Sequence, residues 1–267
     1  MSLVAARNVS LDVPDMNHAT LFGKRRRLRI LKSVSLDIVR GETLGIVGES
    51  GSGKTSLGRT LLRLCEPSEG ELLFDGADIT HQSRFMLKPL RRRMQLIFQD
   101  SQSSLNPRRT IGGILRGALR LHGLEASDKI LEDLVDRVGL PATVLRRYPH
   151  QLSGGQQQRV GIARAISLKP DFVVADEIVS GLDVSTQAQV LHLLKGLKQE
   201  MGLALAFISH DLSVIRHICD RVAIMQAGEI VETGQTAEIF ARPVSVFTKA
   251  LIAAIPLPEP DRGWLES

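Results

Sequence analysis

One stretch decides how this sequence of 267 residues folds: Gly48-Glu49-Ser50-Gly51-Ser52-Gly53-Lys54-Thr55. It matches the phosphate-loop pattern G-x-x-x-x-G-K-[ST] and lies between an apolar segment at 43–47 and a segment of helical periodicity at 55–64. In such a loop the glycines let successive N–H groups face phosphate oxygens, Lys54 reaches the β- and γ-phosphates, and the Thr55 hydroxyl ligates Mg²⁺. The loop and the following Ser56 therefore form a candidate nucleotide-binding site. Alone, the motif indicates a purine nucleoside triphosphatase and nothing more specific.

Strands and helices alternate on both sides of this loop. Residues 30–39 and 43–47 are predicted to form two strands around a turn at 40–42. Residues 110–147 are mostly helical in pattern and predict a small helical lobe. Helices elsewhere alternate with further apolar strands, which are predicted at 71–74, 94–98, 172–175, 204–209 and 221–225. This alternation predicts a mainly parallel sheet that is buried on both faces.

The composition is that of an ordinary globular protein, with 43% hydrophobic and 24% charged residues and a net charge of +5. Cys65 and Cys219 lie far apart and form no CxxC pair, which fits a reducing compartment. No signal peptide is evident, and the most apolar runs, 203–208 and 250–257, are shorter than the ~20 residues that span a bilayer. We therefore expect that, where the protein works at a membrane, it acts from one side and does not cross the bilayer.

Basic clusters raise the question of a nucleic-acid or anionic-lipid partner. They occur at 24–29, 91–93 and 108–109, and no aromatic residues interleave with the arginines. Binding of single-stranded nucleic acid uses such aromatic residues for base stacking. The clusters are therefore interpreted as solvated loops, and no nucleic-acid partner is predicted.

Polar side chains follow three of the predicted strands. Asp176 and Glu177 come directly after an apolar strand, His210 follows the next strand, and Gln99 ends the strand at 94–98. Because the carboxyl ends of parallel strands meet at one edge, these side chains are expected near the phosphate loop. Asp176 is the candidate ligand of Mg²⁺, Glu177 the candidate general base, and His210 the candidate contact to the γ-phosphate and the water. An ordinary polar turn after each strand is the alternative.

A second anion-binding turn is the most informative feature of the chain. Leu152-Ser153-Gly154-Gly155-Gln156 opens a predicted helix, so its N–H groups can bind a phosphate. Two such turns are of little use to one nucleotide unless they belong to different subunits. At this point the sequence resembles the ABC ATPase family, in which this signature faces the phosphate loop of a partner subunit.

The resemblance covers nearly the whole chain, with the motifs in the family's order. It implies an α/β fold with a RecA-like P-loop NTPase core, an antiparallel β subdomain, and an inserted helical subdomain at roughly 100–165. It also implies ATP and Mg²⁺ as cofactors and a head-to-tail ATPase dimer, homo- or heteromeric, with two ATP molecules at the interface. The implied sites are Gly48–Ser56 and Gln99 for the nucleotide, Thr55, Gln99 and Asp176 for the metal, Glu177 and His210 for catalysis, Ser153, Gly154, Gly155 and Gln156 as the signature, and Asp183 in the D-loop.

Further segments resemble the oligopeptide, dipeptide and nickel importer branch. They are found at 98–108, 148–150, 183–191, 208–214 and 247–256, the last within a C-terminal tail at roughly 240–267. The branch implies an ATPase on the cytoplasmic face of a bacterial inner membrane, two permease subunits, and indirect contact with an extracytoplasmic substrate-binding protein. Peptides, nickel, opines and glutathione stay open as cargo. A non-transport ABC ATPase acting on nucleic acid or ribosomes is the alternative function, although the chain has neither a second cassette nor a zinc insertion.

The sequence departs from the family pattern in three places. Ile178-Val179 follows the catalytic glutamate where the family usually has Pro-Thr or Pro-Val, and Ala175 stands where leucine is common. The family also stacks adenine on an aromatic residue before the first strand pair, but the aligned position holds Val13, with Phe22 as a substitute. Because aromatic stacking contributes ~1–3 kcal/mol, the effect is expected on nucleotide affinity.

Overall fold

A computed structural model describes residues 2–14, 27–98 and 104–254. Its centre is a six-stranded sheet of order β10-β9-β3-β8-β7-β6, in which the first pair is antiparallel and the others are parallel. The strands β3, β7 and β8 are buried along their whole length, as expected of a parallel sheet covered on both faces. The bounds are β3 (Thr43–Gly48), β6 (Met94–Ile97), β7 (Phe172–Asp176), β8 (Ala204–Ile208), β9 (Arg221–Gln226) and β10 (Glu229–Gln235).

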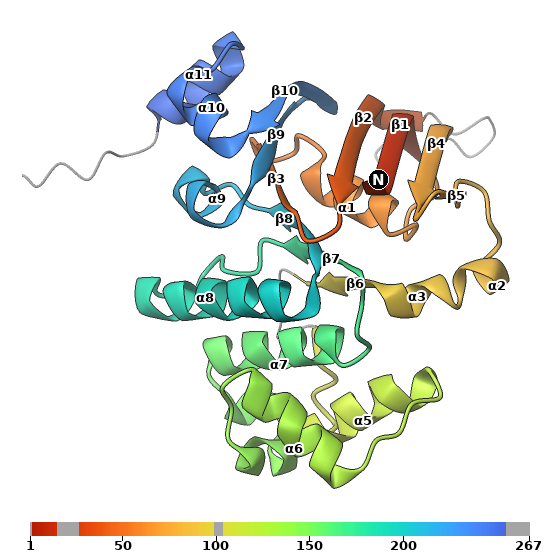
Figure 1. Ribbon diagram of the computed structural model, residues 1–267, viewed down its shortest axis with the longest axis vertical. Helices are drawn as coiled ribbons and strands as arrows, with labels where there is room; N and C mark the ends of the chain where they lie inside the picture. The colour runs from red at the N-terminus through yellow and green to blue at the C-terminus, as the bar shows by residue number, and fades with distance from the viewer. Residues whose placement is uncertain (1, 15–26, 99–103, 255–267) are drawn as a thin grey trace, which may run out of the picture.

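A second, antiparallel sheet of order β2-β1-β4-β5 lies beside the central one (Figure 1). It comprises β1 (Ser2–Pro14), β2 (Arg27–Val39), β4 (Glu69–Phe74) and β5 (Ala77–Asp78). Asp75 and Gly76 both have positive φ at the turn between β4 and β5, which is the backbone that tight hairpins favour. Apolar side chains of both sheets and of α1 (Lys54–Leu61) form one core, so the second sheet is packed against the helix that follows the phosphate loop.

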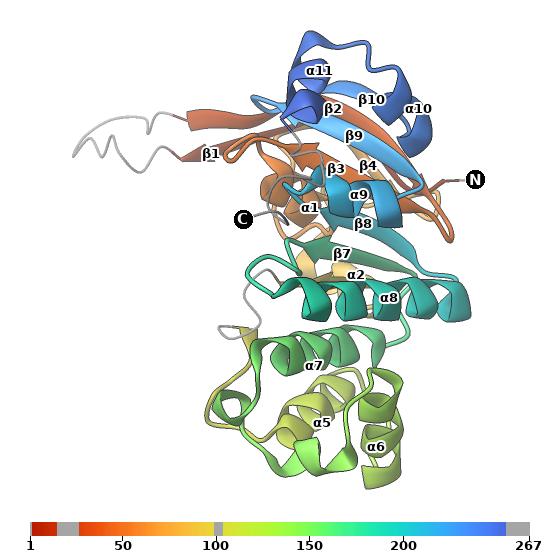
Figure 2. The same cartoon turned by 90° about the vertical axis from the view of Figure 1, so that its left-hand side faces the viewer.

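Helices cover the central sheet and build a lobe at one end of the molecule (Figures 1 and 2). α7 (Gly154–Ile166) lies between that lobe and α8 (Val184–Met201) in both views. The lobe contains α5 (Ile111–Leu121), α6 (Asp128–Arg137) and the short 3-10 helices η1 (Ala142–Arg146) and η2 (Pro149–Gln151). The other helices are α2 (Arg84–Leu87), α3 (Leu90–Arg93), α7 (Gly154–Ile166), α8 (Val184–Met201), α9 (Leu212–Ile218), α10 (Thr236–Ala241) and α11 (Val246–Ala253).

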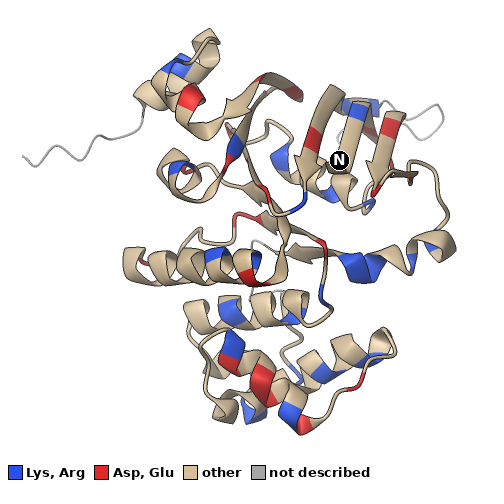
Figure 3. Cartoon of the chain, in the orientation of Figure 1, with Lys and Arg blue, Asp and Glu red and all other residues tan. Residues whose placement is uncertain are grey.

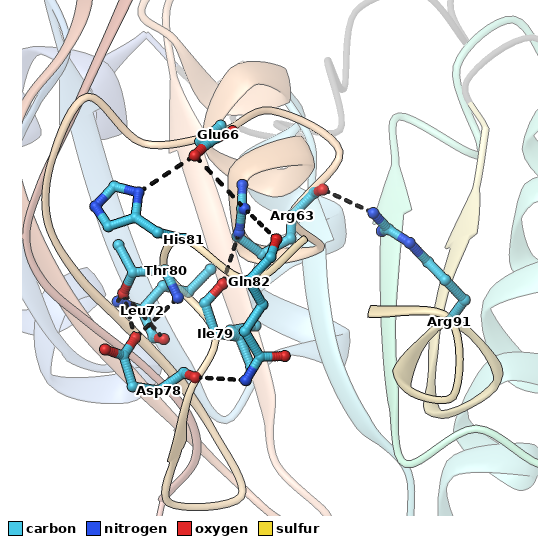
Figure 4. Close-up of polar contacts among 9 residues, drawn as sticks. All are labelled: Arg63, Glu66, Leu72, Asp78, Ile79, Thr80, His81, Gln82 and Arg91. Carbon is cyan, nitrogen blue, oxygen red and sulfur yellow. Dashed lines mark hydrogen bonds and ion pairs between the residues drawn. The ribbon is translucent and has the colours of Figure 1, made fainter. Parts of the chain in front are cut away.

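The C-terminal end of α1 is fixed by two arginines (Figure 4). Arg63 is buried and has a left-handed φ of 52°, so the helix stops at Leu61 and does not run on to residue 64 as the periodicity predicts. Its guanidinium donates to the carbonyl oxygen of Ile79 at 2.8 Å. Arg91 donates to the carbonyl oxygens of Leu62 at 2.5 Å and Arg63 at 2.8 Å. A cation at these carbonyls also interacts favourably with the helix dipole.

The basic cluster on α3, coloured blue in Figure 3, makes hydrogen bonds to other parts of the protein, although Arg92 is exposed. Beside the contacts of Arg91, the Arg92 guanidinium donates to the Leu168 carbonyl oxygen at 3.2 Å. Arg93 donates to the carboxylates of Asp75 at 2.7 Å and Asp171 at 2.5 Å. These three arginines therefore join neighbouring elements of the fold.

Within the described ranges, no helix combines the length and the apolar character that crossing a membrane requires.

Candidate nucleotide site

The phosphate loop connects β3 to α1 through close backbone contacts. A Cβ at position 48 would lie only 2.1 Å from the carbonyl oxygen of Met225 in β9, so Gly48 lets the two strands approach. Gly51 and Gly53 have φ angles of 79° and 100°, which side chains disfavour. The loop thus curls and delivers Lys54 as the first residue of α1.

Lys54 is the buried cation of the loop. Its ammonium group donates to the carbonyl oxygens of Gly48 at 2.8 Å and Glu49 at 2.7 Å, and only 6% of the residue is exposed. Burial holds the pKa of Lys54 below its ordinary value, against the nearby charges of Glu177 and Asp176. The two carbonyl oxygens hold the ammonium group in the loop, where its positive charge can pair with a polyanion.

Thr55 and Asp176 supply neighbouring oxygen atoms. The Thr55 hydroxyl donates to the Asp176 carboxylate at 3.0 Å, although the two residues are 121 positions apart. Asp176 ends β7, which pairs with β8, and β8 pairs with the strand that leads into the loop. Burial raises the pKa of Asp176, although the Thr55 hydrogen bond lowers it. A hydroxyl and a carboxylate fit a hard cation such as Mg²⁺, which keeps several waters and shares phosphate oxygens.

Glu177 and His210 face each other at the ends of neighbouring strands. The Glu177 Oε1 lies 3.5 Å from the His210 Nδ1, and the imidazole is the more exposed of the two side chains. Glu177 has a φ of 47°, and its N–H donates to the carbonyl oxygen of Ile208 at 3.0 Å. The end of β8 therefore holds the backbone that presents the Glu177 carboxylate.

A cavity of ≈ 400 Å³ lies over the loop and contains this carboxylate. Ile30 of β2 also lines it, and a Cβ at position 53 would lie 3.2 Å from the Ile30 carbonyl oxygen. Sequence reasoning missed Ile30, because only the packing of β2 beside the loop brings it there. Val13 is not among the lining residues, while Phe22 and Gln99 lie outside the described residues. The lining residues are Ile30, Ser50, Gly51, Gly53, Lys54, Thr55, Ser56 and Glu177.

The signature turn lies elsewhere, at the start of α7. Ser153 caps the helix: its hydroxyl accepts from the Gln156 N–H at 3.3 Å, and the Gln156 side chain accepts from the Ser153 N–H at 3.1 Å. The buried Gln157 fixes the turn from behind by donating to the carbonyl oxygens of Pro149 at 2.9 Å and Leu152 at 3.1 Å. Gln157 is a positioning residue that the motif did not reveal. None of Ser153, Gly154, Gly155 and Gln156 lines the cavity over the loop.

Asp183 caps α8 next to the signature. Its carboxylate accepts from the Thr186 N–H and hydroxyl, both at 2.8 Å, and from the Ser185 hydroxyl at 2.7 Å. These hydrogen bonds, the one from Ser185 first, lower the pKa of Asp183 to about 2. A Cβ at position 155 would lie 2.4 Å from the Thr186 methyl group, so the starts of α7 and α8 touch. The signature and the D-loop aspartate are therefore packed against each other through Gly155 and Thr186.

A phosphate loop, a hydroxyl–carboxylate pair at its end and a carboxylate beside an imidazole define a P-loop nucleoside triphosphatase. Residues 31–180 match the family model described as ABC transporter. The chain belongs to the ABC transporter family. Within that family it is an ATP-hydrolysing subunit. The family and the fold class predicted from the sequence are confirmed.

Relatives and solved structures agree with this assignment. A peptide import ATP-binding protein of Brucella ovis, so named, is 52% identical over 237 residues, which are 88% of this chain and 75% of that protein. The oligopeptide transport ATP-binding protein OppF of Bacillus subtilis is 46% identical over 242 residues, or 89% of this chain and 79% of OppF. A dimeric ATP-binding cassette in a post-hydrolysis state, bound to ADP and Pi, has a TM-score of 0.76 at 28% identity over 87% of this chain and 98% of that chain.

Proposed function

We propose that this chain hydrolyses ATP to drive peptide uptake through separate membrane subunits. One observation carries the proposal: the Thr55–Asp176 and Glu177–His210 pairs adjoin one phosphate loop in a chain closely similar to proteins named for peptide import. Those names favour import over action on nucleic acid or ribosomes. They do not name nickel, so nickel serves below as the comparison cargo.

Each residue of the site has a separate task in this proposal. The loop N–H groups of residues 48–56 and the Lys54 ammonium bind the phosphates. Thr55 and Asp176, with Gln99, hold Mg²⁺, which when bound neutralises charge on the phosphates. Glu177 accepts a proton from the attacking water, and His210 orients that water and contacts the γ-phosphate. The 3.5 Å separation of the two side chains supports their acting on one water.

The second half of the ATP site is proposed to come from another subunit. The signature at 153–156 does not line the chain's own cavity, yet it presents a helix N-terminus suited to phosphate. A head-to-tail pair with a second ABC ATPase, identical or related, brings one chain's signature to the other's phosphate loop. The dimeric state of one similar cassette, recorded in two solved structures of it, supports this arrangement.

The remaining partners follow from the same proposal. Two permease subunits form the path through the inner membrane, the chain binds them from the cytoplasmic face, and a substrate-binding protein delivers the peptide outside. The helical subdomain at roughly 100–165 and the segment at roughly 240–267 are proposed as the parts that adapt a common cassette to these partners.

Uptake measurements test this proposal. Labelled peptide and labelled nickel are offered to cells with the gene, without it, and with a Lys54→Ala version. We expect peptide uptake to be lost without the gene and with Lys54→Ala, while nickel uptake is unchanged. Unchanged peptide uptake in cells that have no other peptide importer would contradict the proposal, and loss of nickel uptake alone would assign the other cargo.

A further inference from the structure

An apolar groove of ≈ 660 Å³ runs between α8 and α9, away from the cavity over the phosphate loop. Its α8 wall contains Val184, Ala188 and Leu191, and its α9 wall contains Val214 and Ile218. Val184 is 84% exposed, and Ala188 is exposed as well. Apolar side chains that line an open groove are a surface on which another chain segment can be buried.

Three of the six polar residues that line the groove are basic in type, and one is acidic. His192 and Lys195 lie on α8, and His217 lies on α9. Asp211 is the acidic residue among those that line the groove, and its carboxylate is committed to capping α9, since it accepts from the N–H groups of Ser213 at 2.8 Å and Val214 at 3.3 Å. The groove therefore suits an apolar segment that carries negative charge.

The described chain ends on the same side of the molecule. α9 lies between α8 and the α10–α11 pair in both Figure 1 and Figure 2. The Arg216 guanidinium of α9 stacks over the Phe240 ring of α10 at 5.7 Å, which ties the groove wall to the C-terminal helices. The chain then leaves the described structure after residue 254.

We propose that residues 255–267 of the same chain bind in this groove. Their sequence is Ile-Pro-Leu-Pro-Glu-Pro-Asp-Arg-Gly-Trp-Leu-Glu-Ser. A proline-rich chain rises about 3.1 Å per residue, so the segment can span ~40 Å, whereas the 18 residues of α8 span ~27 Å. The segment is therefore long enough to extend along the whole groove.

The chemistry of the segment matches that of the groove. Trp264 and Leu265 form an apolar pair, and an aromatic anchor in an apolar pocket is what dominates the affinity of most interfaces. Three acidic residues, Glu259, Asp261 and Glu266, stand against the single base Arg262. In the proposed complex the tryptophan contacts the apolar lining residues, and these acids face His192, Lys195 and His217. The proposal does not depend on which cargo the transporter carries.

The fluorescence of Trp264 tests the proposal directly, because it is the only tryptophan in the chain. In the intact protein we expect blue-shifted emission and weak quenching by acrylamide. Ala188→Glu places a carboxylate in the groove at an exposed helical position, so the fold is retained while the acidic segment is repelled. We expect this variant to shift the emission to longer wavelength and to increase quenching. Lys195→Glu should shift it in the same direction.

The matched control is Ala142→Glu, which makes the same change at an exposed position in the helical lobe. It should leave the emission unchanged. Three results would overturn the proposal: emission of a fully exposed indole in the parent protein, emission that ignores Ala188→Glu, or a shift that depends on protein concentration. The second would place the segment elsewhere, and the third would place it on a second copy. Circular dichroism establishes that each variant is folded.

Discussion

Glu177 combines an unfavourable backbone conformation with a functional side chain. Its φ of 47° lies in a region that non-glycine residues seldom occupy, and such positions persist where the surrounding structure enforces them. The hydrogen bond from its N–H to the Ile208 carbonyl oxygen provides that enforcement. The result is a carboxylate beside His210 and within the cavity over the loop. We interpret the strained backbone as the means of aiming this carboxylate.

Replacing this carboxylate by its amide separates binding from turnover. Glu177→Gln keeps the shape and the polarity of the side chain, but the amide carries no charge and cannot accept the proton of the attacking water. We expect ATP affinity to be retained and turnover to fall roughly 10²–10⁴-fold, the usual contribution of general base catalysis. Equilibrium binding of a fluorescent ATP analogue and phosphate release give the two readings. Undiminished phosphate release would show that another group is the base.

Asp183 gives a pH-dependent contribution to folding. Its pKa is lowered from 3.8 to about 2, first by the hydrogen bond from Ser185, so the folded state favours the ionised form. The stabilisation is therefore complete above the unfolded value of 3.8 and disappears as the pH falls towards about 2. We expect Asp183→Ala to lower the urea midpoint near pH 5 and to have little effect near pH 2. A difference that stays constant over this range would contradict the assignment.

Among the contacts between elements, the starts of α7 and α8 approach each other closely at Gly155 and Thr186. A methyl group at Gly155 would meet the Thr186 methyl at 2.4 Å, so Gly155→Ala should reduce the free energy of unfolding by about 1–3 kcal/mol. Adding Thr186→Ser removes that methyl, keeps the hydroxyl that bonds Asp183, and should restore most of the loss.

Gly161 is the control for this pair of changes. It lies in the same helix, and a Cβ there would meet nothing within 4 Å. Gly161→Ala should leave stability unchanged or raise it by up to about 1 kcal/mol, because alanine is the better helix former. Urea denaturation compares Gly155→Ala, the double variant and Gly161→Ala with the parent. If Gly155→Ala and Gly161→Ala behaved alike, the close approach of α7 and α8 would not constrain position 155.

Elements with a strong local signal could be predicted from the sequence, and those that depend on distant contacts could not. β3 is apolar throughout and precedes a glycine-rich loop, and the Asp75-Gly76 turn has the backbone that its residues favour. β1 is absent from the strands that the local pattern predicts, since β2 and β4 must both pair with it to form the sheet. The early end of α1 likewise results from the left-handed Arg63 and its distant partner Arg91.

The same division holds for the candidate site at the scale of the whole molecule. The phosphate-loop motif and the strand pattern predicted that Lys54, Thr55 and Asp176 lie near one another, because each proposed chemical role demands a particular residue type after a strand or loop. Ile30 and Gln157 carry no such chemical signature. Their positions depend on how the second sheet and the turn before α7 pack, which no short pattern encodes.

An ATP site shared between two subunits gives Ser153 a role at the partner's nucleotide and none at its own. Ser153→Arg places a large cation at the signature, away from the chain's own cavity. We expect the isolated chain to bind ATP as the parent does, while the assembled transporter loses most of its ATP hydrolysis, because the signature serves the partner's nucleotide. Titration of the isolated variant with a fluorescent ATP analogue, beside Lys54→Ala as the variant that fails to bind, checks this. Loss of binding in isolated Ser153→Arg would place the signature in the chain's own site.

The most direct test of the account is ATP hydrolysis by the complex that is purified through an affinity tag on this chain. We predict that membrane subunits co-purify, that peptide presented with its binding protein increases hydrolysis, and that Glu177→Gln lowers both the basal and the peptide-stimulated rates. Hydrolysis that peptide leaves unchanged, in a preparation without membrane subunits, would contradict the claim that this chain powers peptide import.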